Sequence, residues 1–485
     1  MQNETDRWPS LMNELRRKKD GKPAEASDST ETRTEIERDY DRILFSTPVR
    51  RLADKTQVFP LDRNDSVRTR LTHSHEVSNL ARSLGTTLAF QHGIADTAPS
   101  FQRNLPALLA ATGLVHDLGN PPFGHQGESA IQSWFLEHKE ELLINRGLST
   151  QQQQDFLKFE GNAQAFRLVT RLQLLNDDFG LDLTYATLAA MMKYPVGSDR
   201  TDASVAAKKK HGFFSSEQPI AERVFEQTGL KEGIRHPLAY VMEACDDIAY
   251  VVLDAEDAVK KGLASFSDLM SFLRHHGNSD AIIKSVIDHS QKKQDEYRKN
   301  TELSPYELND VSMQRFRVFA IGALVREAVT AFLENREIIT NGTLTTPLLK
   351  ISKGEKLRAT LKDFGFKHAY VHRSVLKVEL TGYNVIRRLM DIFWDAIVNR
   401  SDEQNVGSQR LHPFSRFVYG RISENYRRVF EFPPGGTENL PIRYRECLLL
   451  TDMISGMTDS YAMTLKDELD SLIGEYKLLR KAPAK

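Results

Sequence analysis

The sequence predicts an all-α protein, and three features indicate this fold class. Apolar residues recur at spacings of three and four over long stretches, strand-like alternation is sparse, and helix-start and helix-stop residues bracket the apolar stretches. The chain has 485 residues, so one large or two fused helical domains are expected. We expect a polar tail over 1–35, a core that carries the candidate site over 36–335, and a helical region over 336–485 whose last part packs back on that core.

Composition places few demands on partners or compartment. Lys and Arg number 65 and Asp and Glu number 66, and this balance does not require nucleic acid. The two cysteines, Cys245 and Cys447, exclude a disulfide framework and indicate a reducing compartment. Because there is neither a signal-like apolar segment at the start nor a long apolar span, we expect a soluble, cytoplasmic protein without membrane contact.

The first 35 residues are polar and charged. Trp8, Leu11 and Leu15 keep helical spacing, so part of the segment is expected to be helical and much of it mobile. The basic run Arg16–Lys19 is expected to be a solvated face rather than a binding patch.

The stretch Arg68–Gly85 predicts a helix with a histidine on its buried face. After His73, apolar residues follow in steps of four, three and four, so His73 points toward the core and is a ligand candidate. His75 falls on the opposite side and is expected at the surface. Arg70 lies one turn from His73 and could meet an anion bound near a metal; a surface salt bridge is the alternative.

An apolar helix expected to begin at Pro106 ends in an adjacent His-Asp pair. It delivers His116 and Asp117 side by side into a loop bounded by Gly and Pro, and His125 and Glu128 follow as the next helix begins. Imidazole and carboxylate groups suit a divalent transition metal, or a harder ion when carboxylates and water dominate. A lone His-Asp pair is more often a core histidine beside a capping aspartate, so further ligands are needed.

Candidate phosphate-binding lysines come next in the chain. A helix ends before Pro195, so Lys193 and Tyr194 are expected at the edge of whatever the helix packs on. Lys193 is either a phosphate donor or a last-turn lysine that complements the helix dipole. The loop Gly197–Gln218 carries Lys208–Lys210, which could close over a triphosphate or remain solvated charge.

The stretch His236–Gly262 predicts a long helix with an acidic stripe beside its apolar face. Asp246, Tyr250 and Asp254 stand four residues apart. Such a stripe is usually solvated, but a central tyrosine next to a strongly apolar face could instead line a pocket. Asp246 could then be the fourth metal ligand, and Tyr250 and Asp254 could reach a sugar hydroxyl.

The rest of the chain stays largely helical in pattern. Helical periodicity covers 266–291, 310–335 and 381–399. Thr340–Lys377 is richer in Gly and β-branched residues, and a short hairpin is expected there. His412–Phe432 is basic and aromatic, a candidate interface or nucleic-acid surface. Cys447–Leu465 predicts an apolar helix that packs back on the core.

Taken together, these residues describe a metal-dependent phosphohydrolase on a helical scaffold. Two histidines and two carboxylates leave open coordination positions, as catalysis requires; the set is His73, His116, Asp117 and Asp246. A metal held there lowers the pKa of bound water and polarises a phosphoryl oxygen. His125, oriented by Glu128, could supply a proton to a leaving oxygen. Arg70, Lys193 and the lysine loop would offset polyphosphate charge, but the residues do not say which P–O bond breaks.

The pattern H…HD…D resembles the HD superfamily of metallophosphohydrolases and, more narrowly, the bacterial deoxyguanosine triphosphate triphosphohydrolases (dGTPases). HDLGNPPFGHQGE is far more specific than the HD pair alone. The matching stretches extend over most of the chain: Thr56–Leu61, Arg68–Val77, His116–Glu128, Glu160–Gln164, Met191–Pro195, Glu243–Tyr250 and Ile454–Ala462.

This resemblance implies roles for individual residues, and it makes 36–335 an HD catalytic core. His73, His116, Asp117 and Asp246 match the metal ligands, with Mg²⁺ or Mn²⁺ as the expected ion and other transition metals as alternatives. His125 matches the catalytic histidine and Glu128 the glutamate that supports it. The positions that match substrate contacts are Gln57, Arg70, Lys193, Tyr194, Tyr250 and Asp254.

The implied reaction is cleavage of a dNTP between the 5′ oxygen and the α-phosphorus, which releases deoxynucleoside and triphosphate. Tyr250 stacked under the deoxyribose would disfavour a 2′-hydroxyl. The family forms homo-oligomers and some members respond to single-stranded DNA, for which Arg416–Arg428 would suit a subunit contact or a binding surface. The alternatives are a broader dNTP triphosphohydrolase, another HD nucleotidase or phosphodiesterase, and a non-catalytic nucleotide- or DNA-binding regulator.

Overall fold

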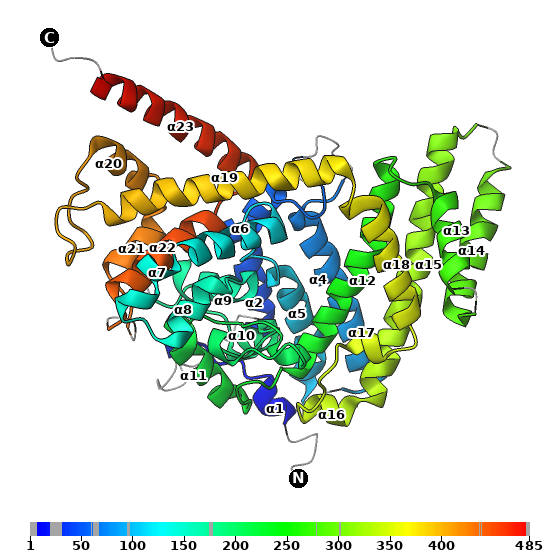
Figure 1. The fold of residues 1–485 in the computed structure, drawn as a ribbon. Helices are drawn as coiled ribbons and strands as arrows, with labels where there is room; N and C mark the ends of the chain where they lie inside the picture. The colour runs from blue at the N-terminus through cyan, green and yellow to red at the C-terminus, as the bar shows by residue number, and fades with distance from the viewer. Residues whose placement is uncertain are drawn as a thin grey trace.

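The structure is a computed structural model in which helices build the whole molecule (Figure 1). It describes residues 7–19, 32–59, 61, 67–94, 98–173, 178–277, 279–299, 302–435, 437 and 439–481. Within these ranges there are helices, turns and isolated bridges but no strand. The all-α prediction is therefore confirmed.

The helices of the first half carry the residues of the candidate site. They are α1 (Trp8–Leu11), α2 (Glu35–Leu44), α3 (Thr47–Arg51), α4 (Arg70–Thr86), α5 (Pro99–Val115), α6 (Gly124–Glu137), α7 (Lys139–Leu142), α8 (Thr150–Leu157), α9 (Gly161–Arg167), α10 (Tyr185–Met191), α11 (Gln218–Thr228) and α12 (Pro237–Lys260). Short 3₁₀ or π turns lie between them: η2 (Arg17–Lys19), η3 (Leu52–Asp54), η4 (Thr87–Gln91), η5 (Ile144–Arg146), η6 (Leu168–Leu172), η7 (Ser198–Arg200), η8 (Ala206–Lys208) and η9 (Ser215–Glu217).

The second half adds an upright group of helices at one end and a long helix across one side (Figure 1). Its elements are α13 (Phe266–Gly277), α14 (Ala281–Tyr297), α15 (Pro305–Glu334), α16 (Arg336–Thr340), α17 (Leu348–Ile351), α18 (Glu355–Gly365), η10 (Phe366–Tyr370), α19 (Arg373–Val398), α20 (Pro413–Gly420), α21 (Glu424–Glu431), α22 (Ile442–Ser455) and α23 (Asp459–Lys481). Helices α13 to α15 form the upright group, α19 runs along α6, and α23 points away at the opposite end. Within the described part of the chain, none of the helices has the length and apolar character needed to span a membrane.

The α4–α5 pair lies at the centre, and its closeness corrects one predicted boundary. A Cβ added at Gly85 of α4 would lie 2.8 Å from the Cα of Pro106, so the two backbones nearly touch. Helix α5 begins at Pro99, and Pro106 lies inside it rather than in its first turn. Proline removes a backbone hydrogen bond there, but Leu105 is fully buried and Asn104 donates to Glu14, so packing offsets the loss.

The described part of the N-terminal segment, residues 7–19 and 32–35, is packed against the rest of the molecule, and the mobility expected for much of the tail stays a prediction. Trp8 and Leu11 are only 2% and 1% exposed. Arg16, expected at a solvated face, is buried and forms ion pairs with Glu35 and Asp39 of α2 at 2.6 and 2.7 Å. Two carboxylates on another helix satisfy this charge, a pairing that a reading of the basic run alone does not anticipate. Residues 1–6 and 20–31 lie outside the described residues.

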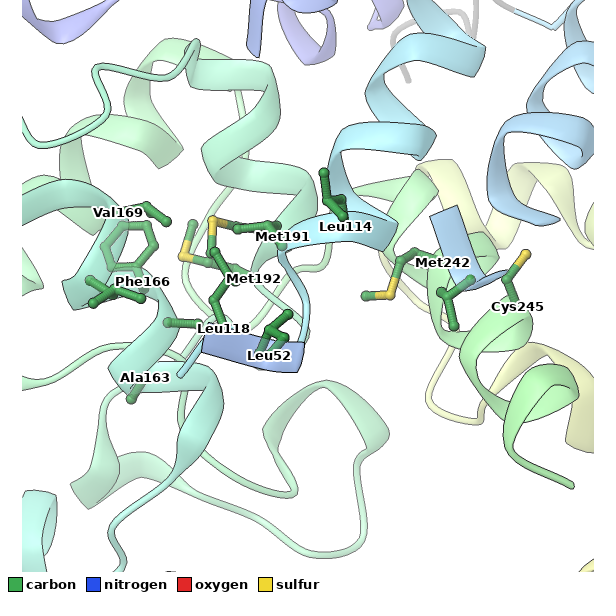
Figure 2. Packing of buried hydrophobic residues seen from close by; sticks show 14 of the residues in the cluster. Leu52, Leu114, Leu118, Ala163, Phe166, Val169, Met191, Met192, Met242 and Cys245 are labelled. Atoms are coloured by element: carbon green, nitrogen blue, oxygen red, sulfur yellow. The ribbon is translucent and has the colours of Figure 1, made fainter. Parts of the chain in front are cut away.

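One hydrophobic core runs through both predicted regions of the chain. Figure 2 shows part of it around the end of α5, with Leu114 and Leu118, Phe166 of α9, Met191 of α10 and Met242 of α12. The same core takes in buried residues of α19, α22 and α23. The boundary at 335/336 stays a prediction, and the elements on its two sides share this core.

The hairpin expected within Thr340–Lys377 is wrong. This segment is fully described and contains α17, α18, η10 and the start of α19. In α18, Leu357, Leu361 and Phe364 are buried on one face at helical spacing. Their apolar periodicity outweighs the Gly and β-branched content on which the hairpin prediction rested.

Candidate active site

A cavity of about 510 Å³ gathers most of the predicted site residues. Its walls come from α4, the α5–α6 loop, the start of α6 and α9, the segment after α10, and α12. The far wall comes from η10 and α19, which lie more than 110 residues further along the chain. The cavity has the size of a small-molecule site.

Four predicted metal ligands meet at the wall of this cavity. The ligand atoms of His73, His116 and Asp246 all lie within 4.8 Å of one another. The Oδ1 atom of Asp246 is 3.2 Å from His73 Nε2 and 3.5 Å from His116 Nε2. Asp117 Oδ2 is 3.5 Å from His116 Nε2, so the fourth donor stands beside this group.

The state of His116 fits a divalent cation. Its Nδ1 lies 2.7 Å from the carbonyl oxygen of Gly113, which can only accept, so Nδ1 carries the hydrogen. In the neutral imidazole the lone pair is then on Nε2, a buried atom with no hydrogen-bond partner in the described structure. A buried, unpaired nitrogen facing two carboxylates is the arrangement that a cation with His and Asp ligands requires.

The electrostatics of the cluster also favour a positive charge between these groups. Burial opposes a charge on His116, but Asp117 and Asp246 outweigh it and raise its pKa to about 9. Burial likewise opposes the charge on Asp246, yet His116, His73 and Lys193 hold the pKa of that carboxyl well below its usual range. Without a metal, the cluster retains a proton where a cation would be held.

Arg70 belongs to the cavity wall and not to a surface salt bridge. Its side chain is 7% exposed, and Nη1 donates to Asp117 Oδ2 at 2.7 Å. The Arg70 Nε and the Gln57 Oε1 are both buried, and neither has a hydrogen-bond partner among the residues that the structure describes. Both side chains line the cavity and keep hydrogen-bonding capacity for a ligand.

His125 and Glu128 form a hydrogen-bonded pair at the start of α6. The Nδ1 of His125 lies 3.1 Å from Glu128 Oε2, and Glu128 Oε1 accepts from the backbone N–H of Gly161 at 2.9 Å. The hydrogen bond to Glu128 raises the pKa of His125. The His125 side chain is 85% exposed, so this imidazole is accessible at the cavity.

The loop before His125 is held in a tight conformation. Phe123 and Gly124 both have left-handed backbones, with φ of 61° and 55°. A Cβ added at Gly119 would lie 2.1 Å from the carbonyl oxygen of Gly161, so only glycine allows the loop to approach α9 so closely. The Gly and Pro residues of this motif therefore set the position from which α6 starts.

Two lysines add positive charge to the cavity. Lys193 lies beyond the end of α10, with Nζ 3.5 Å from Asp246 and 3.6 Å from Glu243. Burial opposes its charge, but Glu243, Tyr194 and Asp246 outweigh it and raise its pKa. Lys210 pairs with Glu160 at 2.6 Å and lines the cavity, whereas Lys208 packs against Gly233.

The Lys193 segment is held by a buried arginine that sequence reasoning missed. Arg235 is fully buried; its Nη1 pairs with Glu243 at 2.6 Å and its Nε donates to the carbonyl oxygen of Lys193 at 2.5 Å. Its guanidinium also lies 5.5 Å from the ring centre of Tyr194. The sequence signal for this arginine was weak, because an arginine before a helix gives no indication of burial. Its partner Glu243 is the first residue of the EACDDIAY stretch, which was the one available indication.

The tyrosines of the predicted sugar site are brought together, but Asp254 is not at the wall. Tyr250 stacks on Tyr370 of η10, with ring centres 5.9 Å apart and planes 14° apart. The Tyr370 hydroxyl donates to Asp254, a buried carboxyl that is not among the described residues lining the cavity. Burial raises the pKa of Asp254 well above its usual range. Tyr194 and Tyr250 line the cavity as expected, and Asp254 stands behind Tyr370.

Sequence reasoning also missed the residues that η10 and α19 contribute. Phe366 and Tyr370, from the region expected to contain a hairpin, and Glu379, just beyond it, line the cavity. They lie in no recognisable motif. The packing of α18 and η10 against α12, and of α19 against α6, brings them near the candidate site residues.

Comparisons with known proteins agree with this site. Residues 70–249 match the family model described as HD domain. A deoxyguanosinetriphosphate triphosphohydrolase-like protein of Listeria monocytogenes is 34% identical over 475 residues, covering 96% of this chain and all of the relative. A probable deoxyguanosinetriphosphate triphosphohydrolase of Pseudomonas aeruginosa is 36% identical, covering 88% of this chain and 91% of its own. A deoxyguanosinetriphosphate triphosphohydrolase of Serratia proteamaculans is 34% identical, with 91% and 94% covered. The chain therefore belongs to the deoxyguanosinetriphosphate triphosphohydrolase-like family of HD-domain proteins.

Proposed function

We propose that this protein is a metal-dependent triphosphohydrolase that converts dGTP to deoxyguanosine and inorganic triphosphate. The observation that carries the proposal is the presence of three features in one cavity: a four-donor His/Asp cluster, a hydrogen-bonded His125–Glu128 pair and cationic side chains. Relatives named for this reaction supply the substrate class.

The ligand cluster provides the electrophilic half of the reaction. The residues that would hold Mg²⁺ or Mn²⁺ are His73, His116, Asp117 and Asp246. When bound, such an ion polarises a phosphoryl oxygen and lowers the pKa of water. Asp117 also accepts from Arg70, which orients its carboxylate and keeps the guanidinium beside the reacting phosphate.

Cationic side chains would bind the triphosphate, and His125 would protonate the leaving oxygen. Arg70, Lys193 and Lys210 line the cavity and would offset the charge of the α-, β- and γ-phosphates. As a water oxygen bonds to the α-phosphorus and the bond to the 5′ oxygen breaks, His125, whose charged form Glu128 stabilises, donates a proton to the 5′ oxygen. This step leaves the nucleoside with a free 5′-hydroxyl and the three phosphates as one product.

In this proposal, Tyr250 and Tyr370 contact the sugar, and Glu379 contacts the base. Tyr250, backed by Tyr370, would stack under the deoxyribose and leave no room for a 2′-hydroxyl. Asp254 acts indirectly, because it accepts a hydrogen bond from the Tyr370 hydroxyl and so fixes that ring. Glu379 offers carboxylate acceptors that complement the N1–H and N2–H donors of guanine. Gln57 and Tyr194 complete the proposed contacts. Homo-oligomers, binding of single-stranded DNA over Arg416–Arg428 and a cytoplasmic location stay predictions.

The test is product analysis over a panel of nucleotides. The purified protein is incubated with Mg²⁺ or Mn²⁺ and dGTP, dATP, dCTP, dTTP or GTP, and products are separated by ion-pair chromatography. Deoxyguanosine and triphosphate from dGTP alone are expected. The matched controls lie on one helix: His73→Ala should abolish turnover, and the exposed His75→Ala should not.

Other outcomes would replace the proposal with a defined alternative. The same cleavage of several dNTPs would indicate a broad triphosphohydrolase. Release of monophosphate or orthophosphate would indicate another HD nucleotidase or phosphodiesterase. If a bound metal is present and no nucleotide is cleaved, a non-catalytic regulator is the better account.

A further inference from the structure

One carboxylate near the C-terminus holds the backbone on two sides of the cavity. Asp459, the first residue of α23, is 2% exposed. It accepts from the backbone N–H of Thr56 at 3.0 Å and from that of Phe123 at 2.9 Å, and also from the Thr56 hydroxyl. Thr56 precedes Gln57, and Phe123 stands two residues before His125.

A second side chain joins the same junction to the same loop. Lys55 is 3% exposed, and its Nζ donates to the carbonyl oxygens of Asn120 and Ser455 at 2.6 and 2.7 Å. Ser455 ends α22 and Asp459 begins α23. We call Lys55, Ser455 and Asp459 the C-terminal clamp.

The clamp contacts the loop at Phe123, where the backbone conformation is unfavourable. Phe123 is left-handed, a conformation that a residue with a Cβ keeps only when its surroundings hold it there. Asp459 bonds its N–H, and its ring packs so closely on α19 that a Cβ added at Gly382 would lie 2.3 Å from it. Loss of the Asp459 bond would free Phe123 to relax, and His125 would move with it.

We infer that Asp459 is a positioning residue for His125, and that the α22–α23 junction is needed to keep the catalytic histidine in place. The inference rests on the role that the proposed function gives to His125. Asp459 has three donors on its two oxygens, so its arrangement serves the loop and not a ligand.

The variant Asp459→Asn tests this with little change in shape. Its amide replaces one acceptor oxygen by a donor, which must then face an N–H or O–H donor. Since a misplacement of about 1 Å can cost about 100-fold in rate, we expect kcat to fall by roughly 10- to 100-fold, with KM little changed. Asp470→Asn is the matched control, because Asp470 lies on the same helix as Asp459. It removes ion pairs with Arg388 of α19 and Lys466 of α23, away from the loop.

A double-mutant cycle separates positioning from general damage. If Asp459 acts through His125, the Asp459→Asn/His125→Ala double variant is as active as His125→Ala alone. Losses that multiply would overturn the inference. Should Asp459→Asn fail to fold, Thr56→Val removes the hydroxyl donor while keeping the backbone contacts, and a smaller loss of kcat with the same non-additivity is expected.

Hydrogen exchange tests the clamp without any substrate. In Asp459→Asn the one remaining oxygen keeps two hydrogen bonds if it faces Thr56 and only one if it faces Phe123, so the amide nitrogen is expected to face the Phe123 N–H. In the full-length, nucleotide-free protein, this variant should therefore speed exchange in peptides covering residues 119–125 by at least about 10-fold. Asp470→Asn should leave these peptides unchanged. Unaltered exchange in Asp459→Asn would overturn the clamp even if the enzyme is active. If no nucleotide is hydrolysed, the proposed function fails while this measurement still decides the clamp.

Discussion

Replacing Glu128 by Gln should remove the acid function of His125 while leaving the cavity intact. Glu128 Oε1 accepts from the Gly161 N–H, and a glutamine carbonyl can keep that bond. The amide nitrogen then faces His125 Nδ1 and can only donate, so Nδ1 must become an acceptor. The imidazole loses the carboxylate that stabilises its charged form.

The structure sets the size of this effect. Hydrogen bonds that involve a charged group are worth about 1.5–3 kcal/mol. Each 1.36 kcal/mol corresponds to a tenfold change in rate. We therefore expect kcat at neutral pH to fall by about 10- to 150-fold.

The pH dependence supplies a second, signed readout. Glu128 raises the pKa of His125, so the protonated acid persists to higher pH and activity is lost as pH rises through that raised pKa. In Glu128→Gln this pKa falls, and the basic limb of the kcat profile should move to lower pH.

Steady-state kinetics over a pH series, with metal content measured on each variant, provide the assay. Glu137→Gln is the control, since this exposed carboxylate at the other end of α6 pairs with Arg387 and lies away from the cavity. An unchanged basic limb together with unchanged kcat would refute the role given to the pair. Loss of bound metal in Glu128→Gln would show that Glu128 supports the ion rather than His125.

Three further predictions follow from neighbouring features. Because the pKa of His116 is raised to about 9 without a metal, ion binding at neutral pH should release about one proton, and the affinity for the ion should rise as pH rises toward 9. Calorimetry in buffers of different ionisation enthalpy measures the proton release, and its absence would contradict this prediction. Tyr250→Ala should raise the kcat/KM for GTP relative to dGTP, and an unchanged ratio would exclude its role against the 2′-hydroxyl. Arg235→Met leaves Glu243 without its closest partner and should lower the free energy of unfolding by about 3–5 kcal/mol; denaturant titration, with the more exposed Arg223→Met as control, checks this, and equal midpoints would be inconsistent with it.

The central helices and the burial of the candidate ligand His73 were predictable because their signals are local. The spacing that begins at His73 fixes which side of α4 is buried, and the structure indeed buries His73 and exposes His75. The same periodicity put Asp246 and Tyr250 beside the apolar face of α12 and left a solvated stripe and a pocket wall both open; the structure places both residues at the cavity. Apolar periodicity is a short-range property, so it can be read without knowing what the helix packs against.

The far wall of the cavity could not be predicted in this way. Tyr370 reaches it because α18 and η10 pack on α12, and Glu379 because α19 packs on α6, contacts between segments far apart in the chain. Asp254 shows the same limit. Its spacing from Tyr250 suggested a place at the wall, but a tyrosine from η10 covers it.

Burial of charged residues was the other source of error. Arg16 lies in a basic run, and such runs are usually solvated, but two carboxylates on α2 neutralise it. Arg235 is likewise buried by Glu243 and by carbonyl oxygens. In each case the partners come from a tertiary contact or a helix turn that composition does not reveal.

The central claim is cleavage at the α-phosphorus to release intact triphosphate, and hydrolysis in ¹⁸O-labelled water tests it most directly. With dGTP and Mg²⁺ or Mn²⁺, mass spectrometry should find one ¹⁸O atom in inorganic triphosphate and none in deoxyguanosine. Label in the 5′-hydroxyl of deoxyguanosine would contradict attack at phosphorus. Label in orthophosphate or pyrophosphate, with a phosphorylated nucleoside as the second product, would contradict triphosphohydrolysis itself.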